Sequence, residues 1–219
     1  MKRLPGCLVA VGLLAVSAVH AASVDGWPGG AALVKSYAPD GDVTVGRIEA
    51  DGTLVLDLPA PAPSAQTVDQ TFAASCSGDG GVSAGPLDVG FTPTSLFAER
   101  DGQELGALHL ATSREVVAWR NSYGEQSAAA GAWYQWVHVA AAAKVDGDCT
   151  TTTWVDAEAT ESYEQFTEHK VGFQAGWNLM RNQVVELYTD KAGKRHAKHV
   201  VVDALATAPE GATWFFVGY

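Results

Sequence analysis

Short apolar or β-branched runs alternate along this chain with turns rich in glycine, aspartate and proline. In residues 53–58, leucine occupies positions 54, 56 and 58, which places these side chains on one face of an extended strand. The preceding Asp51-Gly52 dipeptide favours a tight turn, so residues 47–49 and 53–58 are predicted to form a hairpin. Because the leucines repeat every two residues and not with the period of a helix, this segment indicates β structure.

The same pattern continues to the C-terminal end of the chain. Further strands are predicted at residues 67–76, 96–98, 105–110, 115–119, 133–139, 162–173, 184–188, 199–203 and 214–217, with another opening at 176. Residues 77–90, rich in Gly, Asp and Ser, are predicted to be a loop. Helical spacing also fits the region around 133–139, but its valine and aromatic content favours a strand. No capped amphipathic helix of more than about three turns is predicted.

About ten short strands separated by turn signals are typical of sandwiches and barrels. The sequence therefore predicts an all-β fold, a mostly antiparallel sandwich or partly open barrel with a short N-terminal β lobe. Residues 59–63, Pro-Ala-Pro-Ala-Pro, predict a stiff, extended linker. The expected organisation is a signal peptide at 1–21, a small β segment at 22–62 and a main β-rich domain at 63–219. About forty residues seldom fold alone, so residues 22–62 are expected to pack against the rest.

The first 21 residues have the three parts of a secretory signal peptide. Basic residues at 2 and 3 precede an apolar stretch at 8–19, and a small-residue exit ends at Ala21. The apolar run is about 12 residues, whereas a membrane span needs about 20. Leu4-Pro5-Gly6-Cys7 resembles the end of a lipobox but precedes the apolar stretch. We therefore expect a secreted, periplasmic or cell-envelope protein without a membrane span in the mature chain; a buried N-terminal helix is the alternative.

Two cysteines, Cys76 and Cys149, remain after removal of residues 1–21. An oxidising compartment predicts a disulfide between them. It would close a loop of about 73 residues, which the chain-entropy relation values at about 4 kcal/mol at most. Two cysteines this far apart, without neighbouring histidines, make a poor zinc site.

Two segments carry a resemblance to known families. Gly26-Trp27-Pro28-Gly29-Gly30 and Asp51-Gly52-Thr53-Leu54 make residues 24–59 similar to carboxypeptidase regulatory-like, transthyretin-type β modules. Trp136-Val137, Cys149 and Gly176-Trp177-Asn178 make the whole chain resemble uncharacterised exported β-rich bacterial proteins. The resemblance implies an extracytoplasmic β protein and implies no catalytic residue.

The charge balance narrows the range of partners. The chain has 14 Lys and Arg against 25 Asp and Glu, a net charge of -11. Removal of Lys2 and Arg3 with the signal would make it 12 minus 25, or -13. Nucleic acids and anionic membrane surfaces require clustered basic residues, so neither is an expected partner.

The catalytic and metal motifs are weak. Gly81-Val82-Ser83-Ala84-Gly85 matches G-x-S-x-G, but a nucleophile elbow needs a strand before it and a helix after it. A hydrolase would require Ser83 or another hydroxyl beside His109, His138 or His169. No catalytic residue is therefore assigned.

Metal binding is also not predicted. His196 and His199 would point to opposite faces of a strand. The Asp-Gly clusters, for example residues 146–148, favour turns over calcium sites. No cofactor and no metal site are expected.

Seven tryptophans remain as candidate binding residues. Trp27, Trp119, Trp136 and Trp177 could hold a glycan, a peptide or a small apolar ligand, with core packing as the alternative. Trp133 and Trp136 are expected on opposite faces of one strand. The leading hypothesis is a non-catalytic binding or cell-envelope module; an extracytoplasmic hydrolase and a purely structural surface protein are the alternatives.

Overall fold

The computed structural model describes residues 21–38, 41–61, 64, 66–72, 76, 78–156 and 158–219. The predicted signal peptide, apart from Ala21, and the predicted boundary between residues 62 and 63 lie outside this part of the chain. None of the helices in it combines the length and apolar character that crossing a bilayer requires.

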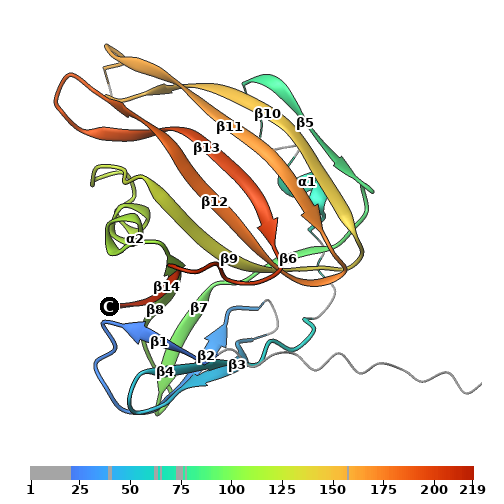
Figure 1. The fold of residues 1–219 in the computed structure, drawn as a ribbon, viewed down its shortest axis with the longest axis vertical. Coiled ribbons are helices and arrows are strands. Elements are labelled where there is room, and N and C mark those ends of the chain that lie inside the picture. The colour runs from blue at the N-terminus through green and yellow to red at the C-terminus, as the bar shows by residue number, and fades with distance from the viewer. Residues whose placement is uncertain are drawn as a thin grey trace, which may run out of the picture.

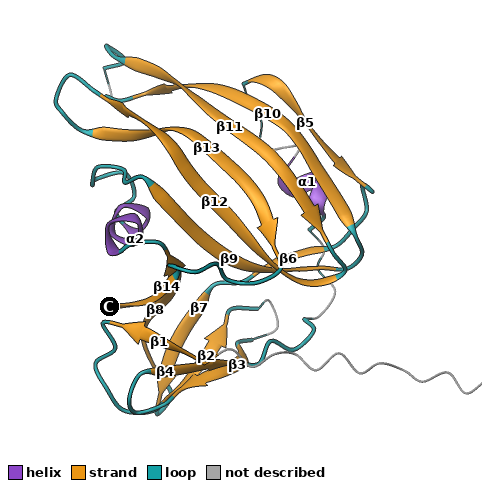
Figure 2. Ribbon diagram, in the orientation of Figure 1, coloured by secondary structure: helices purple, strands orange, loops and turns teal. Residues whose placement is uncertain are grey.

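Fourteen strands in the described residues form one continuous hydrogen-bonded sheet system, which confirms the predicted all-β fold (Figures 1 and 2). Seven of them close into a barrel in the order β14-β1-β4-β3-β2-β7-β8, because β8 also pairs with β14. The barrel strands are β1 (Ala21–Asp25), β2 (Ala32–Ser36), β3 (Val43–Ile48), β4 (Thr53–Leu56), β7 (Leu96–Arg100), β8 (Gln103–Ala111) and β14 (Thr213–Gly218).

The barrel combines both predicted parts of the chain. Strands β1 to β4 come from residues 22–62, with Ala21 added, while β7, β8 and β14 come from the remainder. β2 is antiparallel to β7, and β1 is parallel to β14. Val34, Ile48 and Leu54 are fully buried in its core. The expected packing of the N-terminal segment against the rest therefore takes the form of shared β-ladders.

A curved sheet extends from the barrel. β8 pairs briefly with β9, and the order continues β9-β12-β13-β11-β10-β5, with β6 on β9. These strands are β5 (Asp79–Gly85), β6 (Phe91–Pro93), β9 (Gly131–Val139), β10 (Ala143–Trp154), β11 (Ser162–Phe173), β12 (Gly176–Thr189) and β13 (Arg195–Leu205). The face that carries helix α1 (Val68–Phe72), here called the inner face, is the concave one (Figure 1).

Two predicted strands are wrong because local capping favours helix. Residues 67–76 contain α1, where the Thr67 hydroxyl accepts from Gln70 N and the Gln70 side chain accepts from Thr67 N. This reciprocal pair is a capping box. Residues 115–119 lie in helix α2 (Arg114–Asn121), whose N-cap Ser113 accepts from Val116 N at 3.3 Å. Val116 and Val117 are β-branched residues that favour strands, but as part of α2 both side chains are buried in a hydrophobic core.

The predicted loop at 77–90 is also partly wrong, since it contains β5. This edge strand pairs along β10, with Gly80 opposite Cys149 and Gly81 opposite Asp148. A Cβ on Gly80 would lie 2.3 Å from Asp148 O. The glycines that suggested a loop therefore permit a close backbone approach.

The predicted disulfide is confirmed. Cys76 and Cys149 are bonded, with a sequence separation of 73. Cys149 lies on β10, whereas Cys76 follows α1. The bond thus ties the segment after α1 to β10, on the face of the curved sheet that carries α1.

Candidate ligand-binding cavities

Strand β9 stands between two hydrophobic cores and separates two cavities. Trp133 and Val137 pack on the inner face, and Tyr134 and Trp136 pack toward the barrel. This alternation confirms that Trp133 and Trp136 occupy opposite faces. The side chains of one strand therefore supply the wall of both cavities.

The larger cavity, of about 530 Å³, lies on the inner face and is called the inner-face cavity. Trp119 and Arg120 of α2 line one end and Thr71 and Phe72 of α1 line the other. Side chains of β9 to β13 line its floor. Both short helices that sequence analysis missed thus contribute directly to this site.

Strand register builds a continuous row of side chains across the floor. Trp133 pairs with Asn182, Asn182 with Val202, and Val202 with His169. All four line the cavity. Directly paired side chains have Cβ atoms about 5 Å apart, so an aromatic ring, an amide, an aliphatic group and an imidazole follow one another along this row.

Arg120 lies over the first member of this row. Its Cζ is 4.4 Å from the centroid of the Trp133 ring, and Trp119 meets the same ring edge-on at 5.8 Å. Arg120 and Trp133 line the smaller cavity as well. The guanidinium therefore stands where the two cavities adjoin.

The lining has an unusual charge distribution for so acidic a protein. Among the described residues, neither cavity is lined by Asp, Glu or Lys, and Arg120 has no carboxylate partner. Arg120 is exposed at the cavities, yet partial loss of hydration lowers its pKa. An arginine remains protonated despite such a shift, so it is a positive charge without a counter-ion.

Several polar groups in the inner-face cavity also have no hydrogen-bond partner among the described residues. His169 is 6% exposed, and its Nδ1 is buried without a hydrogen-bond partner. Burial lowers its pKa, so the imidazole is neutral at pH 7. The side chains of Asn182 and Thr167 likewise have no described hydrogen-bond partner. Polar groups left unpaired inside a cavity are suited to a ligand.

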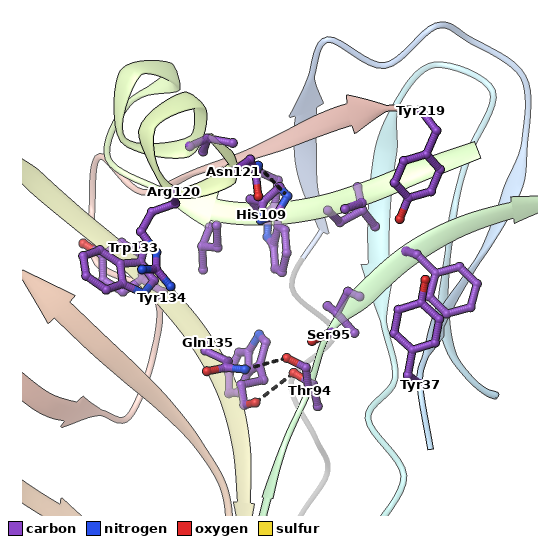
Figure 3. Close-up of a pocket in the computed structure, with 18 residues that line it drawn as sticks. Tyr37, Thr94, Ser95, His109, Arg120, Asn121, Trp133, Tyr134, Gln135 and Tyr219 are labelled. Carbon is purple, nitrogen blue, oxygen red and sulfur yellow. Dashed lines mark hydrogen bonds between the residues drawn. The ribbon is translucent and has the colours of Figure 1, made fainter. Parts of the chain in front are cut away.

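The smaller cavity, of about 260 Å³, lies at the seam where β8 separates from β9 and is called the seam cavity (Figure 3). Gln135 donates to the Thr94 carbonyl at 2.8 Å, and the Thr94 hydroxyl donates to Trp136 O at 2.8 Å. His109 and Asn121 are 3.1 Å apart at the opposite wall. These hydrogen bonds join Thr94 to β9 and β8 to α2 at the two walls of the cavity.

Tyrosines occupy the far end of the seam cavity. Tyr37 and Tyr219 both donate to Glu104, the latter at 2.7 Å, and both line the cavity. The bond to Glu104 and burial raise the pKa of each phenol. Both tyrosines are therefore neutral hydrogen-bonding groups at ordinary pH.

The four predicted tryptophans are not brought together. Trp119 lines the inner-face cavity and Trp136 the seam cavity, where its Nε1 has no hydrogen-bond partner. Trp27 packs edge-on against Phe216 at 5.1 Å, and Trp177 packs on a histidine, His138, at 5.2 Å. Neither Trp27 nor Trp177 lines either cavity.

Arg120 and Asn182 were not among the predicted site residues, and His169 was considered only as a partner for a catalytic hydroxyl. A signal for Arg120 exists in the sequence, because the positions three and four residues before it hold Val117 and Val116 and no acid. Asn182 gives no such signal, since its place depends on pairing with β9. Strand register, which is set by distant residues, created most of the site.

The other candidate chemistries are placed apart. Ser83 lies on β5 and donates to Asp146 O at 3.1 Å, and no described histidine is its hydrogen-bond partner. His196 contacts Asp190 at 2.8 Å, while His199 lies 3.8 Å from Glu168. In the described ranges, no three His, Cys, Asp or Glu side chains are grouped to hold a metal ion.

Comparison with known proteins gives no relative: no protein-family profile, no curated protein and no solved structure matches the chain significantly.

Proposed function

We propose that this chain is an exported, non-catalytic binding protein that holds a small molecule in the inner-face cavity. The observation that carries the proposal is the row Trp133-Asn182-Val202-His169, which joins aromatic and aliphatic surface to polar groups without protein partners. Apolar surface supplies affinity in such sites, and a few polar groups supply orientation.

The volume favours a compact ligand over a long polymer. At about 530 Å³, the cavity falls within the about 300–1,000 Å³ usual for small-molecule sites. Of the ligand classes considered from the sequence, a single sugar unit or a small apolar molecule with a polar group fits better than an extended peptide.

Two neighbouring threonines on β10 provide a matched test. Thr151 lines the inner-face cavity, whereas Thr150 belongs to the opposite face. Thermal-shift screening against monosaccharides, dipeptides and small aryl or alkyl acids and amides is expected to reveal a class that stabilises the wild type. Thr150→Phe should retain that shift, whereas Thr151→Phe should lose it because the added ring occupies the cavity. Absence of any ligand, or equal shifts in both variants, contradicts the proposal.

Export supports the proposal from outside the cavity. The predicted signal segment and the disulfide fit an oxidising compartment. Cell fractionation with intact-mass analysis should place the mature protein outside the cytoplasm, starting at Ala22. A cytoplasmic full-length product would contradict export without affecting the ligand site.

A further inference from the structure

We propose that the inner-face cavity selects a small monocarboxylate, whose anionic group is held jointly by the Arg120 guanidinium and the Asn182 side-chain amide. This inference rests on the proposed binding function and specifies the ligand class. It places the carboxylate at the α2 end of the cavity and the ligand body along the floor toward α1.

Arg120 differs from most of the described arginines in the hydrogen-bond acceptors available to its guanidinium. Four of the described arginines have protein acceptors, namely Arg47 with Glu49, Arg114 with Asp25, Arg181 with Asp203, and Arg100 with the carbonyls of residues 29–31. Arg120 and Arg195 have no described acceptor, and of these two only Arg120 lines a cavity. Among the described arginines, Arg120 is thus the guanidinium that lines a cavity without a protein acceptor.

The contact with Trp133 prepares Arg120 for a planar anion. A guanidinium over an aromatic ring uses its face, and its N–H donors project from its edge. Carboxylates accept two parallel N–H bonds from such an edge. Because Trp133 holds the group at 4.4 Å, less conformational freedom is lost when the anion binds.

Asn182 supplies a second donor at the same end. It is the direct cross-strand partner of Trp133 and faces the same cavity. Its side-chain NH₂ has no described acceptor. A carboxylate has two oxygens and about four acceptor positions, so it can satisfy the arginine and the amide together.

The surrounding charges favour one negative charge and no more. Among the described lining residues of both cavities, Arg120 is the sole permanently charged group. Burial, aided by the nearby Arg120 charge, lowers the pKa of His109, which keeps that imidazole neutral at pH 7. One guanidinium balances one carboxylate, whereas a dianion would leave a charge unpaired in a partly dehydrated site.

The floor defines the rest of the ligand. Val202 follows Asn182 across the sheet, and His169 lies one strand further. Two strand spacings amount to about 10 Å, which is the length of an arylalkanoate. An aromatic or alkyl body would therefore lie over Val202 and approach His169 and Phe72, whose rings are 5.8 Å apart.

Isothermal titration calorimetry with 4-phenylbutyrate and its neutral amide, 4-phenylbutanamide, tests the inference. The wild type should bind the carboxylate at least about 10-fold more tightly than the amide. Arg120→Gln should weaken carboxylate binding by about 10- to 100-fold and change amide binding less than about 3-fold. Arg195→Gln, the matched control at an arginine outside the cavities, should change neither.

Asn182→Asp separates loss of binding from loss of folding. The new carboxylate would lie beside Arg120 and neutralise it, so this variant should remain folded by circular dichroism and still fail to bind 4-phenylbutyrate. Equal affinity of wild type for acid and amide, no binding of the acid, or undiminished binding by Arg120→Gln would overturn the inference. A neutral ligand that binds the wild type but not Thr151→Phe would preserve the proposed function while refuting the carboxylate assignment.

Discussion

His169 shows how a single residue links the cavity to stability. It lies at the end of the cross-strand row with Nδ1 unpaired, against the ring of Phe72. Burial lowers its pKa, because charging an imidazole away from water is unfavourable. In the unfolded chain the same imidazole titrates near its ordinary pKa of about 6.5. Folding therefore favours the neutral form.

This difference predicts that acidification destabilises the protein. Below about pH 6.5 the unfolded state binds more protons at residue 169 than the folded state, so the free energy of unfolding falls as pH decreases through this range. His169→Gln should show a shallower fall between pH 7.5 and 5.5 in urea titrations. His109 and His138, whose pKa values burial also lowers, should retain part of the slope. Superimposable pH profiles for variant and wild type would contradict this account.

At the scale of elements, α2 is short but sets the position of the candidate anion site. It has eight residues, too few to be stable alone. Ser113 caps its first turn, and Val116 and Val117 anchor it beside Phe215. Trp119 and Arg120 occupy its last turns, so the cavity depends on a helix with few internal bonds.

Removing the cap should weaken both the fold and the site. Ser113→Ala is expected to lower the free energy of unfolding by about 1 kcal/mol, measured by urea denaturation. Affinity for a cavity ligand should fall as well, because Arg120 would lose part of its support. Ser162→Ala, at an exposed position on β11, is the control and should change neither quantity.

The disulfide links two elements, because it joins the segment after α1 to β10. The Cys76→Ser/Cys149→Ser variant should lose up to about 4 kcal/mol of stability, because the unfolded chain regains the freedom of a loop of about 73 residues. Cys149 also lines the inner-face cavity. Melting curves of wild type and variant, with and without dithiothreitol, check this: the reductant should lower the wild-type midpoint and leave the variant unchanged.

Local sequence signals predicted several strands correctly but missed β5, β10 and both short helices. Residues 162–173 coincide with β11, and the turn at 189–194 joins β12 to β13 as expected. Each of these features depends on neighbours in sequence. Residues 115–119 became helical because Ser113 and contacts with distant strands outweighed two valines.

The candidate site was predictable only in part for the same reason. Trp119 and Trp136 were singled out as aromatic residues, and both line cavities. The proximity of Arg120 to Trp133, and of Asn182 to both, depends on the packing of α2 against β9 and on the register of β9 with β12. Amino-acid composition does not predict that register, since strand pairing depends on the whole sheet.

At the scale of the whole molecule, the barrel joins strands that are distant in sequence. β2 pairs with β7, β1 pairs with β14, and β8 closes the ring by pairing with β14. Ile48, Leu54 and Leu108 contribute to one core from both predicted parts of the chain. Neither part contains a complete set of barrel strands.

A fragment of residues 64–219 should therefore fail to fold. It would lack four barrel strands, expose the edges of β7 and β14, and leave in water the core side chains that β1 to β4 cover. Heteronuclear NMR should show collapsed amide dispersion or aggregation, whereas residues 22–219 should give a dispersed spectrum. A well-dispersed spectrum from the fragment would show that the curved sheet is an independent folding unit.

The parallel contact between β1 and β14 also constrains how the polypeptide reaches its native state. Val24 of β1 pairs with Trp214 of β14, far away in sequence. Closure of the ring must therefore wait until the chain has been made through β14, and contacts of such sequence separation form slowly. Until then β1 has a free edge, and such an edge can pair with another chain.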